Sequence, residues 1–191
     1  MTIDGILKNA VTAGASDVFI VAGSALTYKI SGSFVPQDIE LLTPAATDIL
    51  VRYVYELAER DMLEFLRTGD DDFAFTVAEL SRFRANVYKQ RGSLSAVIRV
   101  IPFGVPDRER LNIPERVVAG ANANSGLIVV TGLAGSGKST TLACMIDHIN
   151  SSRAGHIVTL EDPIEYLHRN KRCIISQREI SLDTDSYVSA L

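Results

Sequence analysis

The stretch "TGLAGSGKSTT", residues 131–141, decides the fold of this chain. Gly132, Gly137, Lys138 and Ser139 fit the pattern G-x-x-x-x-G-K-[ST]. The glycines of such a loop let the backbone curl so that successive N–H groups point inward at a phosphate, and the helix that follows adds the positive end of its dipole. A plain glycine-rich turn between a strand and a helix is the alternative, and the flanking sequence argues against it.

The flanks of the loop have the periodicities that it requires. "GLIVVTG", residues 126–132, is an apolar run rich in β-branched residues and predicts a strand buried on both faces of a parallel sheet. "KSTTLACMIDHIN", residues 138–150, places apolar residues at 142, 145, 146 and 149, which is one face of a helix. We therefore predict a strand, a phosphate-binding loop and a helix in direct succession.

The loop predicts ATP and Mg²⁺ as ligands. Lys138 is expected to reach the β- and γ-phosphates, and the Ser139 hydroxyl is expected to hold Mg²⁺. The predicted nucleotide-binding residues of this segment are Gly132, Ala134, Gly135, Ser136, Gly137, Lys138, Ser139 and Thr140.

An acidic segment follows the next apolar run. In "HIVTLEDPIEYLH" a predicted strand, Ile157 to Leu160, leads directly into Glu161, Asp162 and Glu165. Carboxylates at the carboxyl end of a parallel strand face the same crevice as the phosphate loop, where they can bind Mg²⁺ through water or polarise an attacking water. The same residues fit, about equally well, the acidic N-terminus of a helix that begins at Pro163.

The chain is expected to be α/β in two parts. Residues 1–101 predict an α+β domain: a helix, two strands, a helical region at 43–69 that is either one long helix or two, and three alternating runs typical of an antiparallel meander. Three prolines and a glycine make 102–115 the expected linker. Residues 116–191 are expected to form the phosphate-loop domain with a mostly parallel sheet.

Composition excludes several function classes. The hydrophobic fraction of 47% with 22% charged residues is that of an ordinary soluble globular protein, and a net charge of −4 argues against general nucleic-acid binding. The sequence contains no apolar run of about 18 residues and no signal-peptide pattern, so we expect a cytoplasmic protein. Cys144 and Cys173 are expected to be buried free thiols, and the spacing of His148, His156 and His168 predicts no metal site.

Five stretches together carry a family resemblance. "ASDVFI", "SRFRANVYKQRGSLSAVIRVIP", "GLIVVTGLAGSGKSTTLACMIDHIN", "HIVTLEDPIEYLH" and "SQREISLDTDSY" occur in the order and spacing of the type II/type IV secretion ATPase superfamily. The chain resembles above all the type IV pilus retraction ATPases, of the PilT type. The resemblance implies a PAS-like N-terminal domain and a RecA-like core in a hexameric ring, at the inner face of the cytoplasmic membrane. It also implies an inner-membrane pilus platform protein as partner and ATP-driven pilin disassembly.

The resemblance also assigns roles to residues. It implies that Glu161 and Glu165 are catalytic together with Lys138, with Glu165 activating water, and that Asp162 joins Ser139 at Mg²⁺. It further implies that arginines of the N-terminal domain reach the nucleotide phosphates, and Arg84 and Arg99 are the residues we expect in this role. From the residues alone, Arg82 and Arg84 share a strand face opposite Phe83 and Ala85, which also fits an exposed polar face of a half-buried sheet.

The end of the chain carries one more expectation. The family pattern continues beyond residue 191 into a Walker B strand and a histidine-containing box, so we expect a fragment that binds nucleotide but turns it over poorly or not at all. The alternatives are a pilus-extension or type II secretion ATPase, and a non-catalytic assembly module.

Overall fold

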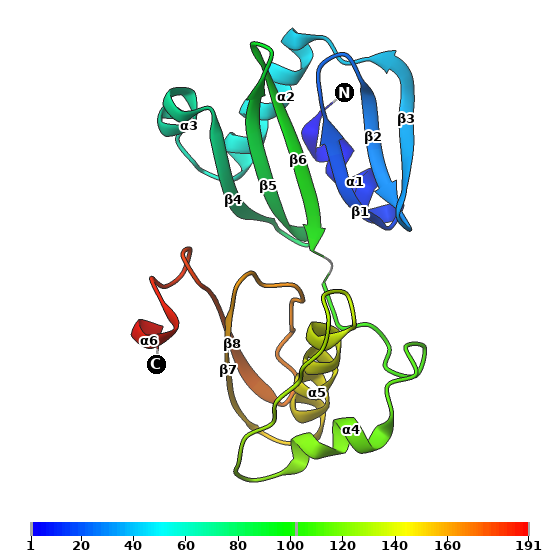
Figure 1. Ribbon diagram of the computed structural model, residues 1–191, viewed down its shortest axis with the longest axis vertical. Helices are drawn as coiled ribbons and strands as arrows, with labels where there is room; N and C mark the ends of the chain where they lie inside the picture. Colours follow the sequence, from blue (N-terminus) through cyan, green and yellow to red (C-terminus); the bar gives the residue numbers. More distant parts are fainter. Residues whose placement is uncertain (1, 102, 191) are drawn as a thin grey trace. The chain divides into compact units, whose positions relative to one another are not determined.

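The computed structural model describes residues 2–101 and 103–190. The chain divides into two compact units, Met1–Pro102 and Phe103–Leu191 (Figure 1). The helices α2 and α5 are the longest, with 14 and 15 residues. In the part of the chain that is described, no helix has the length and apolar content needed to cross a bilayer.

The first unit is built on a six-stranded sheet with the strand order β3-β2-β1-β6-β5-β4, and all neighbours are antiparallel. Its strands are β1 (Ala15–Ile20), β2 (Ala25–Ile30), β3 (Ser33–Leu41), β4 (Asp70–Val77), β5 (Ser81–Gln90) and β6 (Ser93–Ile101). The predicted antiparallel meander is confirmed as β4, β5 and β6, because short polar turns bring each alternating run beside its sequence neighbour. The outer edge of β6 pairs with β1.

Three helices accompany this sheet: α1 (Ile3–Thr12), α2 (Pro44–Leu57) and α3 (Leu63–Thr68). The predicted N-cap of α2 is confirmed, since the Thr43 hydroxyl accepts a hydrogen bond from the Ala46 N–H at 3.1 Å and Pro44 opens the helix. The helical region at 43–69 therefore contains two helices. The second ends at Thr68 and is capped by Gly69, whose φ of 90° lies in the left-handed region that favours glycine.

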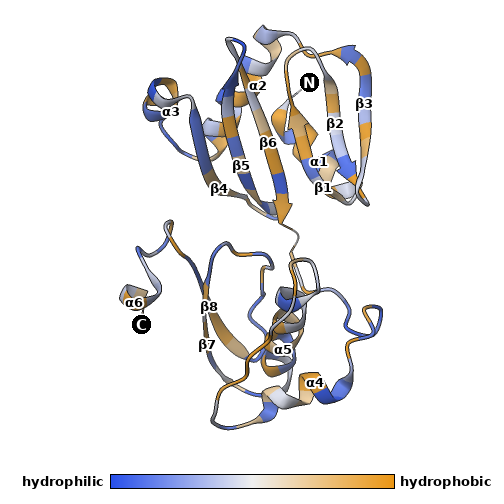
Figure 2. Cartoon of the chain, in the orientation of Figure 1, coloured by the Kyte–Doolittle hydropathy of each residue, from blue (hydrophilic) through white to orange (hydrophobic). Residues whose placement is uncertain are grey.

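The hydrophobic core of the first unit lies between one sheet face and the helices α1 and α2. Along β5 the side chains alternate, with Phe83, Ala85 and Val87 fully buried. The Phe83 ring stacks on Phe75 with 5.3 Å between ring centroids. The same alternation of apolar and polar residues is visible along the strands of this sheet (Figure 2). Burial of one face leaves the opposite face of β5 polar, as predicted for Arg82 and Arg84.

The second unit contains a two-stranded parallel sheet, β7 (Gly155–Glu161) beside β8 (Cys173–Glu179). Its helices are α4 (Glu115–Ala119), the 3₁₀ turn η1 (Gly120–Asn122), α5 (Lys138–Ser152) and α6 (Tyr187–Ala190). The predicted helix after the glycine loop and the predicted strand before the acidic segment are confirmed as α5 and β7.

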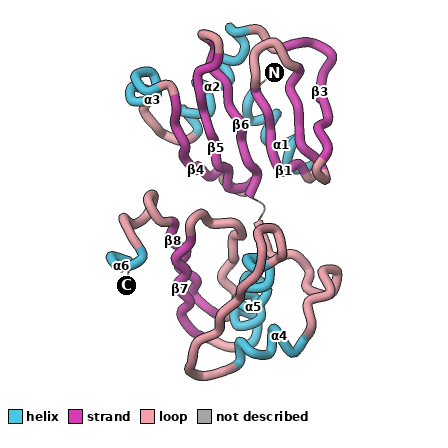
Figure 3. The backbone as a smooth tube through the Cα atoms, viewed as in Figure 1, coloured by secondary structure: helices cyan, strands magenta, loops and turns pink. Residues whose placement is uncertain are grey.

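The strand predicted at residues 126–132 is wrong for the structure. This segment runs as a loop without strand pairing (Figure 3), and the side chains of Leu127 and Val129 are 86% and 69% exposed. A strand buried in a parallel sheet needs hydrogen-bond partners and covered faces. Among the described residues, β7 and β8 pair only with each other, so the apolar run has no neighbouring strand. The apolar face predicted for α5 is also only partly right, because Met145 is buried but Leu142 is 42% exposed.

The segment expected as a linker is attached to the second unit from Phe103 onward. The N–H of Gly104 donates to the Leu167 carbonyl at 3.1 Å, and the Cys144 thiol of α5 lies 3.7 Å from the Pro106 carbonyl oxygen. A proline-rich composition indicates irregular backbone, and here that backbone packs on a helix.

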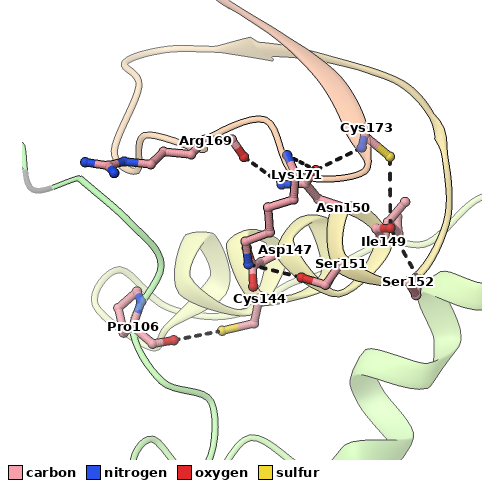
Figure 4. A network of polar contacts seen from close by, with 10 residues as sticks. All are labelled: Pro106, Cys144, Asp147, Ile149, Asn150, Ser151, Ser152, Arg169, Lys171 and Cys173. Atoms are coloured by element: carbon pink, nitrogen blue, oxygen red, sulfur yellow. Dashed lines mark hydrogen bonds and ion pairs between the residues drawn. The ribbon is translucent and has the colours of Figure 1, made fainter.

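A buried asparagine joins α5 to the start of β8 (Figure 4). The Asn150 amide donates to the Arg169 carbonyl at 2.8 Å, and its oxygen accepts from the N–H groups of Lys171 and Cys173 at 3.1 and 3.2 Å. These bonds satisfy backbone groups just before the strand and at its first residue, so they fix where β8 begins. Cys144 and Cys173 are buried free thiols, as predicted.

Candidate functional site

The glycine loop has the backbone that a phosphate cradle requires. Gly135 and Gly137 have φ angles of 74° and 90°, in the left-handed region that favours glycine, and Gly137 is the residue before α5. At Gly132 a Cβ atom would lie 2.7 Å from the Ser136 hydroxyl oxygen, so a larger residue there would require the serine side chain to rotate. The first turn of α5 thus opens directly into a curled, exposed loop, where its unpaired N–H groups can meet an anion.

Lys138 lies across this loop. Its Nζ atom donates to the carbonyl oxygens of Gly132 at 3.1 Å and Leu133 at 2.9 Å. An ammonium group has three N–H donors, so one donor is left for a ligand. The predicted residues Ala134 and Ser136 are exposed in the same loop. The lysine charge is therefore held at the loop itself, where a phosphate would sit.

A cavity of about 350 Å³ lies beside the first turn of α5. Ser139 lines it from the helix, Glu161 lines it from the end of β7, and Asp162 and Glu165 line it from the segment after that strand. The structure thus brings together the hydroxyl and the three carboxylates that the sequence singled out. The alternative interpretation of the acidic segment is wrong, because residues 162–168 form no helix.

The three carboxylates differ in their surroundings. Glu161 is half-buried, and its Oε1 atom accepts hydrogen bonds from the Thr159 hydroxyl at 2.7 Å and from Gln177 Nε2 at 3.0 Å. Asp162 and Glu165 are exposed. One carboxylate is therefore fixed by the protein, and the other two face solvent.

The oxygen donors of the cavity suit Mg²⁺, which prefers hard oxygen ligands and keeps several waters. In the described ranges, 2–101 and 103–190, no group of three or more His, Cys, Asp and Glu side chains is arranged to hold a metal on its own. A magnesium ion at Ser139 therefore fits as an ion shared with the oxygens of a bound phosphate chain.

Sequence reasoning missed three residues of this site: Tyr166, His168 and Gln177. The hydroxyl groups of Tyr166 and Thr140 are 2.8 Å apart, which links the acidic segment to the first turn of α5. His168 lines the cavity, and burial lowers its pKa below the ordinary value of 6.5, so its imidazole is neutral at pH 7. Each of these contacts joins segments far apart in sequence, and no local pattern predicts them.

Arg84 and Arg99 lie in the first unit, directly opposite each other on β5 and β6. On the polar face of the sheet, Arg84 Nε is 2.8 Å from Asp72 Oδ1 and Arg99 Nε is 3.3 Å from Asp17 Oδ1. The predicted pair is thus placed side by side, with carboxylate partners for both guanidinium groups.

A curled glycine loop, a lysine and a serine at a helix N-terminus, and carboxylates across a shared cavity define a phosphate-binding-loop domain of the nucleotide-binding class. The chain belongs to the Type II/IV secretion system protein family, which matches residues 1–190.

Two curated relatives and one solved structure are similar to this chain over its whole length. It is 37% identical over 191 residues to the type IV pilus ATPase PilU of Pseudomonas aeruginosa, and 37% identical over 192 residues to the type IV pilus retractation ATPase PilT of that organism. These matches cover all of this chain but 50% and 55% of the relatives. The crystal structure of the pilus retraction motor PilT with bound ADP superposes with a TM-score of 0.85 at 41% identity, over 100% of this chain and 55% of that one. The chain spans about half the length of the curated relatives it matches.

Proposed function

We propose that this chain binds ATP with Mg²⁺ and serves in an ATPase that powers type IV pilus retraction, the removal of pilin subunits from the filament base. The observation that carries the proposal is the single cavity lined by Ser139 of the glycine loop and by the carboxylates of Glu161 and Glu165. The names of the relatives, a pilus retractation ATPase and a retraction motor with bound ADP, support the choice of nucleotide and process.

Each residue of the proposed site in the second unit has a role that its position supports. The loop N–H groups and the Lys138 ammonium bind the β- and γ-phosphates, while Ser139 and Asp162 hold Mg²⁺, which neutralises phosphate charge when bound. Glu165 is exposed at the cavity and accepts a proton from the attacking water, with Glu161 as the second catalytic carboxylate. Arg84 and Arg99 are proposed as further phosphate-binding residues.

The assembly is also a proposal drawn from the family. The first unit would be PAS-like, and the second would be part of a RecA-like core. Six copies would form a ring in the cytoplasm at the inner face of the cytoplasmic membrane. There the ring would act on an inner-membrane pilus platform protein, without nucleic acid.

Calorimetric titration with Mg·ADP and Mg·ATP tests the proposed site. Lys138→Ala is expected to weaken binding about 10- to 100-fold, because hydrogen bonds to charged groups contribute about 1.5–3 kcal/mol. Lys8→Ala, at an exposed position of α1, is the matched control and should leave the affinity unchanged. Equal affinities of the wild type and Lys138→Ala would contradict the proposed site.

A second variant separates binding from chemistry. Glu165→Gln should keep the nucleotide affinity of this chain within about twofold. Introduced into an assembly that hydrolyses ATP, it should lower hydrolysis by about 10²- to 10⁴-fold, the usual effect of losing a general base. Hydrolysis that continues unchanged in Glu165→Gln would remove this residue from the catalytic role.

A further inference from the structure

Gln177, on β8, makes three hydrogen bonds to the acidic segment. Its Nε2 atom donates to Glu161 Oε1 at 3.0 Å and to the Tyr166 carbonyl at 2.8 Å, and its Oε1 atom accepts from the His168 N–H at 2.8 Å. One side chain therefore holds both ends of the segment that lines the cavity.

The partners of Gln177 fix the orientation of its amide. A backbone N–H can only donate and a backbone carbonyl can only accept, so Oε1 must face His168 and Nε2 must face Tyr166. The second Nε2 proton then points at Glu161. Rotating the amide by 180° would set donor against donor and acceptor against acceptor, so the arrangement has one stable orientation.

The parallel pairing of the two strands explains why Glu161 is held twice. Thr159 and Gln177 are directly paired across β7 and β8, and residues paired in this way point to the same face of the sheet. Glu161 is two residues beyond Thr159 and so shares that face. Both hydrogen bonds end on the same oxygen, Oε1, and neither engages Oε2.

From this geometry we propose that Gln177 is a positioning residue for the Glu161 carboxylate: it pins Oε1 and presents Oε2 to the magnesium–nucleotide complex. The inference rests on the proposed function, because Glu161 is taken to act on a bound nucleotide. Through Tyr166, which contacts Thr140, the same amide also ties the acidic segment to the first turn of α5.

Two substitutions distinguish the effect of the hydrogen bonds of Gln177 from the effect of its size. Gln177→Met keeps the length of the side chain and removes all three hydrogen bonds. Gln177→Glu keeps the shape and an acceptor for the His168 N–H, but sets a carboxylate against the Glu161 carboxylate. Gln90→Met, at an exposed position of the first unit, is the matched control.

The readout is the ratio of ADP dissociation constants without and with Mg²⁺. We expect Gln177→Met to reduce this ratio by about threefold to tenfold, since the net contribution of an intramolecular hydrogen bond is lost, and Gln177→Glu to change it more than Gln177→Met does. Gln90→Met should leave it unchanged. In a Glu161→Ala background, Gln177→Met should have no further effect on the ratio, because its target is gone. An equal effect in both backgrounds would overturn the proposal.

A measurement without nucleotide keeps this inference separate from the proposed function. In ¹H–¹⁵N spectra of the unliganded chain, Glu161→Ala should shift the side-chain amide signals of Gln177, whereas Lys8→Ala should not. If these signals move but the wild type binds no nucleotide, the proposed function fails and the contact stands without its proposed role. If the signals do not move, the positioning role is contradicted whatever the nucleotide affinity.

Discussion

The two units of this chain differ in how far their apolar side chains are buried. The continuous hydrophobic core lies in the first unit, where Phe83, Val54 and Leu7 are fully buried. The second unit leaves Leu127 and Leu133 86% and 84% exposed. Because buried apolar area is the main source of stability, the first unit is expected to be the more stable of the two. The second unit, which contains the candidate ligand site, is expected to be less stable. A ligand at that site should therefore stabilise the second unit more than the first.

The largest expected effect comes from opening the core of the first unit. Phe83→Ala should lower the free energy of unfolding of that unit by about 3–5 kcal/mol, because the ring is fully buried and stacked on Phe75. Leu127→Ala removes an exposed side chain of the second unit and should cost less than about 0.5 kcal/mol. Denaturant unfolding monitored by circular dichroism checks both values. Similar costs for the two variants would break the contrast between the units.

The next effect is the acid sensitivity of the first unit. Burial alone would raise the pKa of Asp71, but hydrogen bonds from Arg60 and Tyr55 outweigh burial and lower it. A carboxyl whose pKa is lowered by folding contributes stability above its unfolded pKa of about 3.9, and that stability is lost as the pH falls through the folded pKa. Asp71→Asn should cost about 1–2 kcal/mol at pH 7 and flatten this acid dependence. If the midpoint of thermal unfolding depends on pH between 2 and 5 in the same way in Asp71→Asn and in the wild type, the proposed role of Asp71 is contradicted.

A smaller effect at a different pH is expected for the second unit. Burial lowers the pKa of His168, so folding favours the neutral imidazole. Its contribution to stability is complete above the unfolded pKa of about 6.5 and declines as the pH falls toward the folded pKa. Hydrogen exchange of β7 and β8 at pH 5–7 should show this decline in the wild type but not in His168→Gln. The same pH dependence in both proteins would contradict it.

The smallest expected effect is at an exposed apolar residue of the first unit. Ile39 is 97% exposed on β3, so Ile39→Ser should change the free energy of unfolding by no more than about 0.5 kcal/mol. A loss of more than 1 kcal/mol in denaturant unfolding would show that the exposure of a side chain does not determine how much its substitution destabilises the chain. The comparison of the two units, which is based on exposure, would then be weakened.

The sequence predicted those elements whose signals are local. Thr43 as helix cap, Gly69 as helix end and the alternation along β5 all depend on neighbours within a few residues, and all are confirmed. The prediction of a strand at 126–132 was wrong because an apolar run contains no information about which strand would pair with it.

The candidate site shows the same limit. Its glycine loop is a contiguous motif and was predicted with its residues. The acidic segment allowed two interpretations, and the absence of a helix at residues 162–168 decides between them. Gln177 is invisible in the sequence because it meets Glu161 through strand pairing across 16 residues.

Hydrogen exchange with and without Mg·ADP tests most directly the claim that the glycine loop and the acidic segment form one nucleotide site. We predict that exchange slows in residues 132–142 and 161–168 together in the wild type and in neither segment of Lys138→Ala, with α1 unchanged as an internal reference. Protection of the loop without the acidic segment, or of neither in the wild type, would contradict the claim.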